Sequence, residues 1–218
     1  MRYLYLLPAA FLAPVIHEWV KALVSTAQGD PSPKTYGYLT ANPFKFFEPI
    51  GFLFIFLFGF GWGRPVQTSA LHYKNRPRGV VLTYMIPVLV NLLLGVGAVV
   101  VANIIAIRTI GPLHYGFFLI FMRNAVWTPH IHEIAIFLLA SFAYVNINLA
   151  LFNLIPVFPL ATNKLLLTFS SPSTIAWLNH YEKPMQVILV LLLALGIVEQ
   201  VTWPFMHRIV SFAWVMVS

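Results

Sequence analysis

Long apolar runs with almost no charge constrain this chain more than any other feature of its sequence. A helix needs about 20 apolar residues to cross a bilayer, and four runs reach that length. These expected spans are Tyr3 to Ala27, Val80 to Ile107, Ile134 to Leu160 and Pro184 to Phe205. Only 9% of the 218 residues are charged, whereas an ordinary soluble domain has about 25%. We therefore expect residues 1–218 to form a single all-α, polytopic integral membrane domain embedded in the lipid bilayer.

Two shorter apolar runs make the number of membrane segments uncertain between four and six. Ile50 to Trp62 predicts a thin span or a re-entrant segment shielded by protein, and Ile110 to Met122 predicts an interfacial or re-entrant segment. Residues 28–46 differ in kind, because their glycines and prolines indicate turns. Alternation over residues 36–40 predicts a short strand. We therefore expect a small membrane-associated loop or β element near residues 28–46.

The basic residues predict an orientation and exclude some partners. Four of them lie between the second and third apolar regions, namely Arg64, Lys74, Arg76 and Arg78. By the positive-inside rule this segment faces the cytoplasm. The formal net charge of +7 comes from scattered residues, without the basic stripe that nucleic acid needs, so we expect no nucleic-acid partner. Because the chain has no cysteine, disulfides and thiolate metal sites are excluded.

The polar face of the first expected span carries the pattern His-Glu-x-x-Lys, formed by His17, Glu18 and Lys21. In the zinc-protease motif His-Glu-x-x-His, the two histidines lie on one helix face and bind zinc, and the glutamate acts as general base on the metal-bound water. Here Lys21 replaces the second histidine, and a protonated ammonium group has no lone pair for a metal. The pattern is therefore typical either of a membrane protease or of an inactive relative.

Six segments between residue 17 and about residue 165 resemble, in family order, the short bacterial type of site-2 protease, an intramembrane zinc metalloprotease. Besides the histidine pattern they are GDPSPK at 29–34, GYLTANP at 37–43, FEPIG at 47–51, GWGRPV at 61–66 and FNLIPVFPL at 152–160. They are similar to the family segments GDPTAK, GRLTLNP, IDPIG, GWAKPV and FNLIPIPPL. The resemblance implies a site-2 protease-like core over about residues 3–165, C-terminal helices over about residues 183–218, and a multi-pass protein of a bacterial cytoplasmic membrane.

The departures from the family pattern fall on the residues that perform the chemistry. The family continues its last segment with Asp-Gly, and that aspartate is the third zinc ligand, whereas Leu160 is followed here by Ala161. The resemblance leaves His17 as a vestigial metal ligand and Glu18 as a vestigial general base, with Lys21 and Ala161 at the two lost ligand positions. A catalytic zinc site has three protein ligands and an open position. We therefore expect no cofactor.

Lys21 suggests what replaces the metal. Glu18 and Lys21 are three residues apart on a helix and can pair, and a charge inside a bilayer must be paired or lie in a wet cavity. We hypothesise an ion pair in which the ammonium group supplies the positive charge of the lost metal. The resemblance also implies a groove for a substrate or partner segment near the end of the third span. Its candidate residues are Asn146, Asn148, Asn153, Pro156 and Pro159. For the asparagines, hydrogen bonding between helices is an equally good interpretation.

Three functional hypotheses follow. The first is a catalytically inactive site-2 protease homologue, or pseudoprotease, that binds or regulates another transmembrane protein or segment. The second is an active intramembrane zinc metalloprotease with non-standard ligands that cleaves transmembrane segments, and only here would zinc be a cofactor. Its densest group of candidate ligands is His130, His132 and Glu133, which the expected topology places on the outer side. The third is a fixed subunit of a membrane complex.

Overall fold

The computed structural model describes residues 2–109, 131–157 and 160–216, and within these ranges the chain is helical without any strand. The α-helices are α1 (Arg2–Ala27), α2 (Ser32–Thr35), α3 (Pro49–Phe58), α4 (Arg76–Thr109), α6 (Ile131–Asn153), α7 (Ala161–Phe169), α8 (Pro172–His180), α9 (Glu182–Ala194) and α10 (Ile197–Val215). Two short 3-10 helices are η1 (Pro43–Phe46) and η2 (Ala70–His72). The expectation of an all-α polytopic membrane protein is confirmed.

Three of the described helices are long and apolar enough to cross a membrane, within Tyr5–Ala27, Arg76–Thr109 and Ile134–Asn153. They correspond to the first three expected spans, although the third ends at Asn153 rather than at Leu160. The fourth expected span is broken into two helices. Its residues form α9 and α10, which are bent by 69° relative to each other, because Gly196 at the break adopts the left-handed conformation with φ of 71°. The pair makes at most one further crossing.

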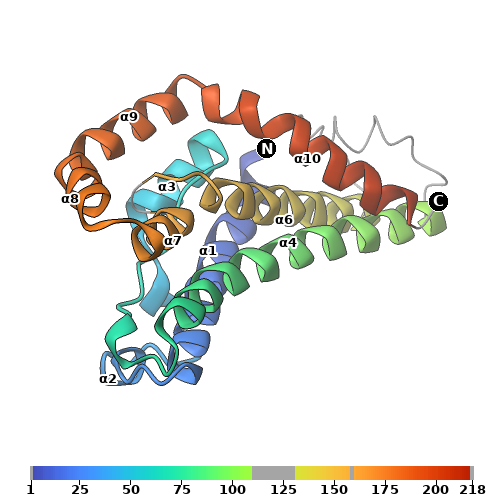
Figure 1. The fold of residues 1–218 in the computed structure, drawn as a ribbon. Coiled ribbons are helices and arrows are strands. Elements are labelled where there is room, and N and C mark those ends of the chain that lie inside the picture. The colour runs from blue at the N-terminus through green and yellow to red at the C-terminus, as the bar shows by residue number, and fades with distance from the viewer. Residues whose placement is uncertain (1, 110–130, 158–159, 217–218) are drawn as a thin grey trace.

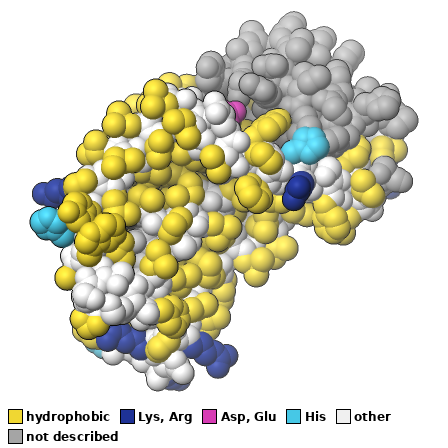
Figure 2. All heavy atoms as spheres, turned by 45° about the horizontal axis from the view of Figure 1, so that its top comes forward, with side chains coloured by type: hydrophobic (Ala, Val, Ile, Leu, Met, Phe, Trp, Pro, Cys, Tyr) yellow, Lys and Arg dark blue, Asp and Glu magenta, His cyan; other side chains and the backbone are white. Residues whose placement is uncertain are grey.

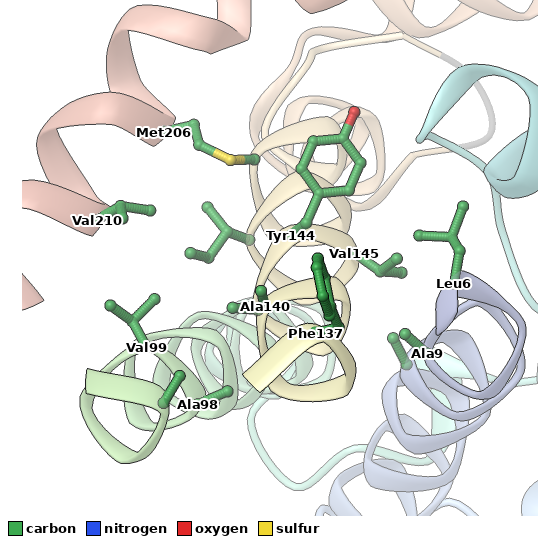
Figure 3. Packing of buried hydrophobic residues seen from close by; sticks show 14 of the residues in the cluster. Leu6, Ala9, Ala98, Val99, Phe137, Ala140, Tyr144, Val145, Met206 and Val210 are labelled. Carbon is green, nitrogen blue, oxygen red and sulfur yellow. The ribbon is translucent and has the colours of Figure 1, made fainter. Parts of the chain in front are cut away.

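The molecule is built around α4 and α6, which lie side by side, with α1 packed against both (Figure 1). Figure 3 shows how apolar side chains from these helices, from alanines to Phe137 and Tyr144, meet α10 in one cluster. Its labelled members include Ala9 from α1, Val99 from α4, Ala140 from α6 and Met206 from α10. Small residues such as Ala9 and Ala140 allow membrane helices to approach closely. This packing fixes the inner face of α1 relative to α4 and α6.

Gly95 on α4 lies in tight contact with α6. A Cβ atom added there would lie 2.5 Å from Cγ1 of Ile147, whereas one added at Gly97 would meet nothing within 4 Å. Of these two glycines, Gly95 is therefore the one that faces the neighbouring helix. The face shown in Figure 2 is broadly hydrophobic, and several of its Lys and Arg side chains gather at the lower end, as expected for a protein whose middle contacts lipid.

The helix α3 is shorter than the run Ile50 to Trp62 suggested. Its 10 residues span about 15 Å, which is half of a bilayer core, so of the two predictions for this run a re-entrant segment fits better than a span. The chain then continues without helix or strand over residues 60–69, here called the 60–69 segment. It lies directly against α3, because a Cβ atom on Gly51 would collide with the backbone of Trp62. The run Ile110 to Met122 lies outside the described residues.

The strand predicted over residues 36–40 is wrong. The backbone N–H of Tyr36 donates to Ser32 O and ends α2, and Gly37 then turns the chain with φ of 70°. The alternation reflects the burial of Tyr38 alone, whose ring packs 5.9 Å from that of Phe46, while Tyr36 and Leu39 stay exposed. Of the loop or β element expected near residues 28–46, the structure therefore contains the loop.

Asp30 ties this loop to the chain that precedes α4. Its buried carboxylate accepts hydrogen bonds from Ser25 Oγ (2.8 Å), the backbone N–H of Ser32 (2.9 Å) and the backbone N–H of Ser69 (2.7 Å). Burial acts to raise the pKa of the Asp30 carboxyl, but the hydrogen bonds outweigh it and hold the pKa below the ordinary 3.8. This contact anchors the end of the 60–69 segment beside the end of α1.

Candidate functional site

A cavity of about 250 Å³, here called the α1 cavity, opens between α1, the 60–69 segment, α4, the end of α6 and the start of α7. Its polar walls are formed by His17, Glu18, Lys21, Gln67, Thr68, Tyr84, Asn153 and Lys164. Ala161 and Leu160 also line it. The cavity therefore brings together His17, Lys21 and Ala161. Ala161 lies at least 140 positions from the other two in the sequence, and the family resemblance placed all three at one metal site.

The inner face of α1 carries the three polar residues of the His-Glu-x-x-Lys pattern. His17, Glu18 and Lys21 are all buried, whereas Trp19 between them is 41% exposed. This follows from helical geometry, because residues three or four positions apart share a face. The pattern is therefore directed into the protein rather than toward lipid.

The carboxylate of Glu18 accepts polar contacts from two residues in the cavity wall. Nζ of Lys21 lies 3.1 Å from Oε2 and 3.3 Å from Oε1 of Glu18. The backbone N–H of Val66 donates a further hydrogen bond of 2.8 Å to Oε2. A buried carboxylate is stable only when its charge is compensated in this way. The 60–69 segment can come close enough to contribute that donor because Gly63 has no side chain. A Cβ atom at this position would lie only 2.9 Å from Pro14 O.

The ammonium group of Lys21 has a second partner on α4. Its Nζ lies 5.2 Å from the centre of the Tyr84 ring, within the range of a cation–π interaction. The hydroxyl of Tyr84 in turn lies 3.2 Å from Oγ1 of Thr68. The charge of Lys21 is thus held between Glu18 and an aromatic face.

His17 is oriented by a chain of asparagines that connects the three long helices. Its Nδ1 lies 2.8 Å from Oδ1 of Asn91 on α4. Nδ2 of Asn91 donates to Oδ1 of Asn146 on α6 (2.8 Å) and to Ala13 O (3.3 Å). Because these two contacts fix Asn91 with its oxygen toward the ring, Nδ1 of His17 is the donor, and the lone pair of a neutral ring resides on Nε2. Asn91 was missed as a site residue, and its only sequence signal was an amide inside an apolar run.

The residues predicted for a partner groove separate in the structure. Only Asn153 lines the α1 cavity, and its Nδ2 donates to Leu149 O at 2.9 Å. Asn146 belongs to the asparagine chain, as the helix–helix interpretation predicted. Asn148 is buried, and its Nδ2 has no hydrogen-bond partner among the described residues. Pro156 is exposed and lines none of the cavities, and Pro159 lies outside the described residues.

The donor atoms at the α1 cavity do not fit a zinc centre. Among the side chains that the structure describes, no three from His, Asp or Glu gather in one place. Of the family ligand positions, His17 offers an imidazole, Lys21 an ammonium group paired with Glu18, and Ala161 a methyl group. One ligand falls short of the three that a zinc site uses. His130 lies outside the described residues, as do the side chains of His132 and Glu133.

Taken together, the helices and the buried polar face define an integral membrane protein of the all-α class. Over 206 residues the chain is 27% identical to a protein of Bacillus subtilis (strain 168) named "Putative zinc metalloprotease YwhC". The alignment covers 93% of this chain and 86% of that protein. No model of a known protein family matches the chain, and no solved structure matches it. The similarity supports a site-2 protease-like protein at low identity.

Proposed function

We propose that this chain is a catalytically inactive site-2 protease homologue that binds or regulates another membrane protein, or serves as a subunit of a membrane complex. One observation carries the proposal. At the two positions where the family resemblance implies metal ligands, Lys21 is paired with Glu18 and Ala161 presents a methyl group to the same cavity. The sequence segments around the site resemble those of the family, whereas the residues at two of its three ligand positions do not.

The ion pair opposes both metal binding at position 21 and the action of Glu18 as a general base. A protonated lysine has no lone pair to offer a metal. The Glu18 carboxylate is occupied by Lys21 on both oxygens and by the N–H of Val66 on one of them. A general base must have an oxygen within reach of the water it deprotonates. The same contacts that stabilise Glu18 therefore compete with a catalytic role.

The walls of the α1 cavity suit an extended peptide segment. On one side lies the 60–69 segment, which has no helix or strand of its own, and on the other lie apolar side chains such as Leu149 and Leu160. The N–H groups of Arg64, Val66 and Ser69 in this segment donate within the protein, so an extended partner would pair with its remaining backbone groups while the partner's side chains enter pockets. Binding of this kind needs shape and hydrogen-bonding groups, and it needs no metal.

Zinc content of restored variants tests the loss of the metal site. Purified, tag-free wild-type protein in detergent should contain far less than one zinc per chain by elemental analysis. The double variant Lys21→His/Ala161→Asp should contain about one zinc per chain, because three family ligands again face one cavity. The single variant Lys21→His serves as the control and should stay low. A zinc ion in the wild type that is lost on His17→Ala would overturn the proposal in favour of the active protease with non-standard ligands.

Site-specific crosslinking tests partner binding. A photoreactive residue in place of Gln67, which lines the α1 cavity and is exposed, should crosslink in native membranes to one membrane protein. The matched control is Leu12, which is 41% exposed on α1 and lines none of the cavities, and it should not give that product. Copurification of the same protein at unit stoichiometry would indicate a fixed subunit rather than a transient regulator. The same product from both positions, or from neither, would refute binding in the cavity.

A further inference from the structure

A second cavity of about 540 Å³, here called the α7 cavity, lies beside the first, between η2, α4, α7 and α8. It shares three wall residues with the α1 cavity, namely Thr68, Tyr84 and Lys164. It reaches none of the three residues of the His-Glu-x-x-Lys pattern. An inference about this cavity is therefore independent of the proposed loss of the metal site.

The walls of the α7 cavity combine positive charge with hydroxyl groups. Arg76 and Lys164 supply two cationic side chains, and none of the residues that line the cavity is an aspartate or a glutamate. Four hydroxyls also line the cavity, but that of Tyr73 is hydrogen-bonded to Ser25, that of Thr168 donates to Lys164 O, and those of Thr68 and Tyr84 lie 3.2 Å from each other. The two cationic side chains are therefore the groups that can bind a phosphate here. The composition of the walls indicates an anionic ligand.

Two carboxylates on neighbouring elements, those of Glu18 and Asp30, have partners of their own. Glu18 is paired with Lys21. Asp30 accepts its hydrogen bonds from Ser25, Ser32 and Ser69, and its side chain is fully buried. Neither of them lines the α7 cavity. In addition, the cavity lies at the first turn of α4, where Arg76 begins the helix without any acidic residue, and a helix N-terminus favours an anion.

The surroundings of the cavity indicate that the anion is carried by a lipid. Large apolar side chains are exposed on the elements around it, with Leu71 78% exposed on η2, Phe169 66% on α7 and Trp177 57% on α8. Tryptophan at the headgroup level and basic residues on the cytoplasmic side are typical of membrane interfaces. Basic pockets between membrane helices on that side are suited to anionic headgroups.

We propose that the α7 cavity binds the phosphate of an anionic phospholipid, with Arg76 and Lys164 contacting the phosphate and the apolar residues Pro77, Val80, Leu167 and Ile175 lining its less polar end. Removal of these two charges weakens the binding of a lipid phosphate specifically. The lipid headgroup therefore holds α7 against α4 at the membrane surface.

Titration of the full-length protein with lipids tests the proposal. The protein in neutral detergent micelles is titrated with dioleoyl phosphatidylglycerol, with dioleoyl phosphatidylcholine and with inorganic phosphate, and its thermal midpoint is recorded. Phosphatidylglycerol should raise the midpoint and the other two should not. In the variant Arg76→Gln/Lys164→Gln, the concentration of phosphatidylglycerol needed for half of the effect should rise about tenfold or more, since each basic residue near a membrane surface contributes about 1 kcal/mol.

The matched control is Arg64→Gln/Lys74→Gln, which removes the same charge from exposed residues that line neither cavity and should leave the titration unchanged. Equal weakening in both double variants would mean general surface electrostatics and would overturn the proposal. An equal effect of phosphatidylcholine would overturn it too, and an equal effect of inorganic phosphate would identify a free anion instead. Should the Arg76→Gln/Lys164→Gln variant fail to fold, the single variant Arg76→Gln at an exposed position must still weaken the binding several-fold.

Discussion

Removing Lys21 alone is expected to destabilise the protein more than removing Lys21 and Glu18 together. In the variant Lys21→Met, the carboxylate of Glu18 keeps only the N–H of Val66 as a donor. Its side chain is 9% exposed, so water compensates little of the charge. In the double variant Glu18→Gln/Lys21→Met no buried charge remains, and the amide oxygen of glutamine can still accept from Val66.

The magnitude follows from the burial of the pair. Leaving one partner of a buried ion pair without the other costs about 3–5 kcal/mol, whereas replacing both is often close to neutral. Loss of the contact between Lys21 and the Tyr84 ring adds about 0.5–1 kcal/mol to every variant that lacks the lysine. We therefore expect a coupling free energy of at least ~2 kcal/mol between the two residues.

Reversible unfolding in mixed micelles measures this coupling. The wild type, the variants Glu18→Gln and Lys21→Met, and the double variant are titrated with sodium dodecyl sulfate while helical circular dichroism is followed. The four unfolding free energies form a double-mutant cycle. If the two single effects add to within about 0.5 kcal/mol of the double effect, the residues behave as independent sites, and the ion pair cannot be what compensates Glu18.

Two further predictions concern the scaffold. Gly95→Ala should lower the unfolding free energy by about 1–3 kcal/mol, because the new Cβ would lie 2.5 Å from Ile147 Cγ1. The control Gly97→Ala should be neutral or should stabilise the protein by up to about 1 kcal/mol. Equal effects of the two substitutions in the same titration would contradict the packing of α4 on α6. Asp30→Asn should lower the thermal midpoint at pH 7 and should lower it less at pH 3. The folded pKa of the Asp30 carboxyl lies below its unfolded value of about 3.9, so its stabilisation is fully present above that value and is lost progressively as the pH falls below it and through the folded pKa. A loss of the same size at both pH values would refute a role for the charge of Asp30.

Much of the site on α1 was predictable because its members are neighbours in sequence. The spacing of His17, Glu18 and Lys21 fixes them on one helix face as soon as the apolar run establishes the helix. Membership of Ala161 in the same site came from the family resemblance rather than from any local pattern. Asn91 could not be assigned, since nothing near it in sequence indicates which of many apolar neighbours it faces. Its partner His17 is 74 positions away.

The prediction of the membrane spans was correct for three long helices and missed a bend in the fourth. Hydropathy identified α1, α4 and α6, because their apolar runs exceed the thickness of the bilayer core. It did not reveal the 69° bend between α9 and α10, because apolar residues continue on both sides of Gly196 and composition does not record the φ of one glycine. The false strand over residues 36–40 had a similar origin, since an alternating pattern predicts a strand only where a partner strand exists.

The sequence by itself determined that the backbone must be helical in the spans, because lipid offers no partners for its N–H and C=O groups. It also determined which groups are available for chemistry: one imidazole, one carboxylate and one ammonium group on α1, and a methyl group at position 161. Only the tertiary structure decided that these groups share one cavity and that the charge of Lys21 is directed to Glu18. The packing of α1 against α4 and α6, with the 60–69 segment laid along it, sets those distances, and contacts between residues far apart in a chain are not encoded in any local pattern.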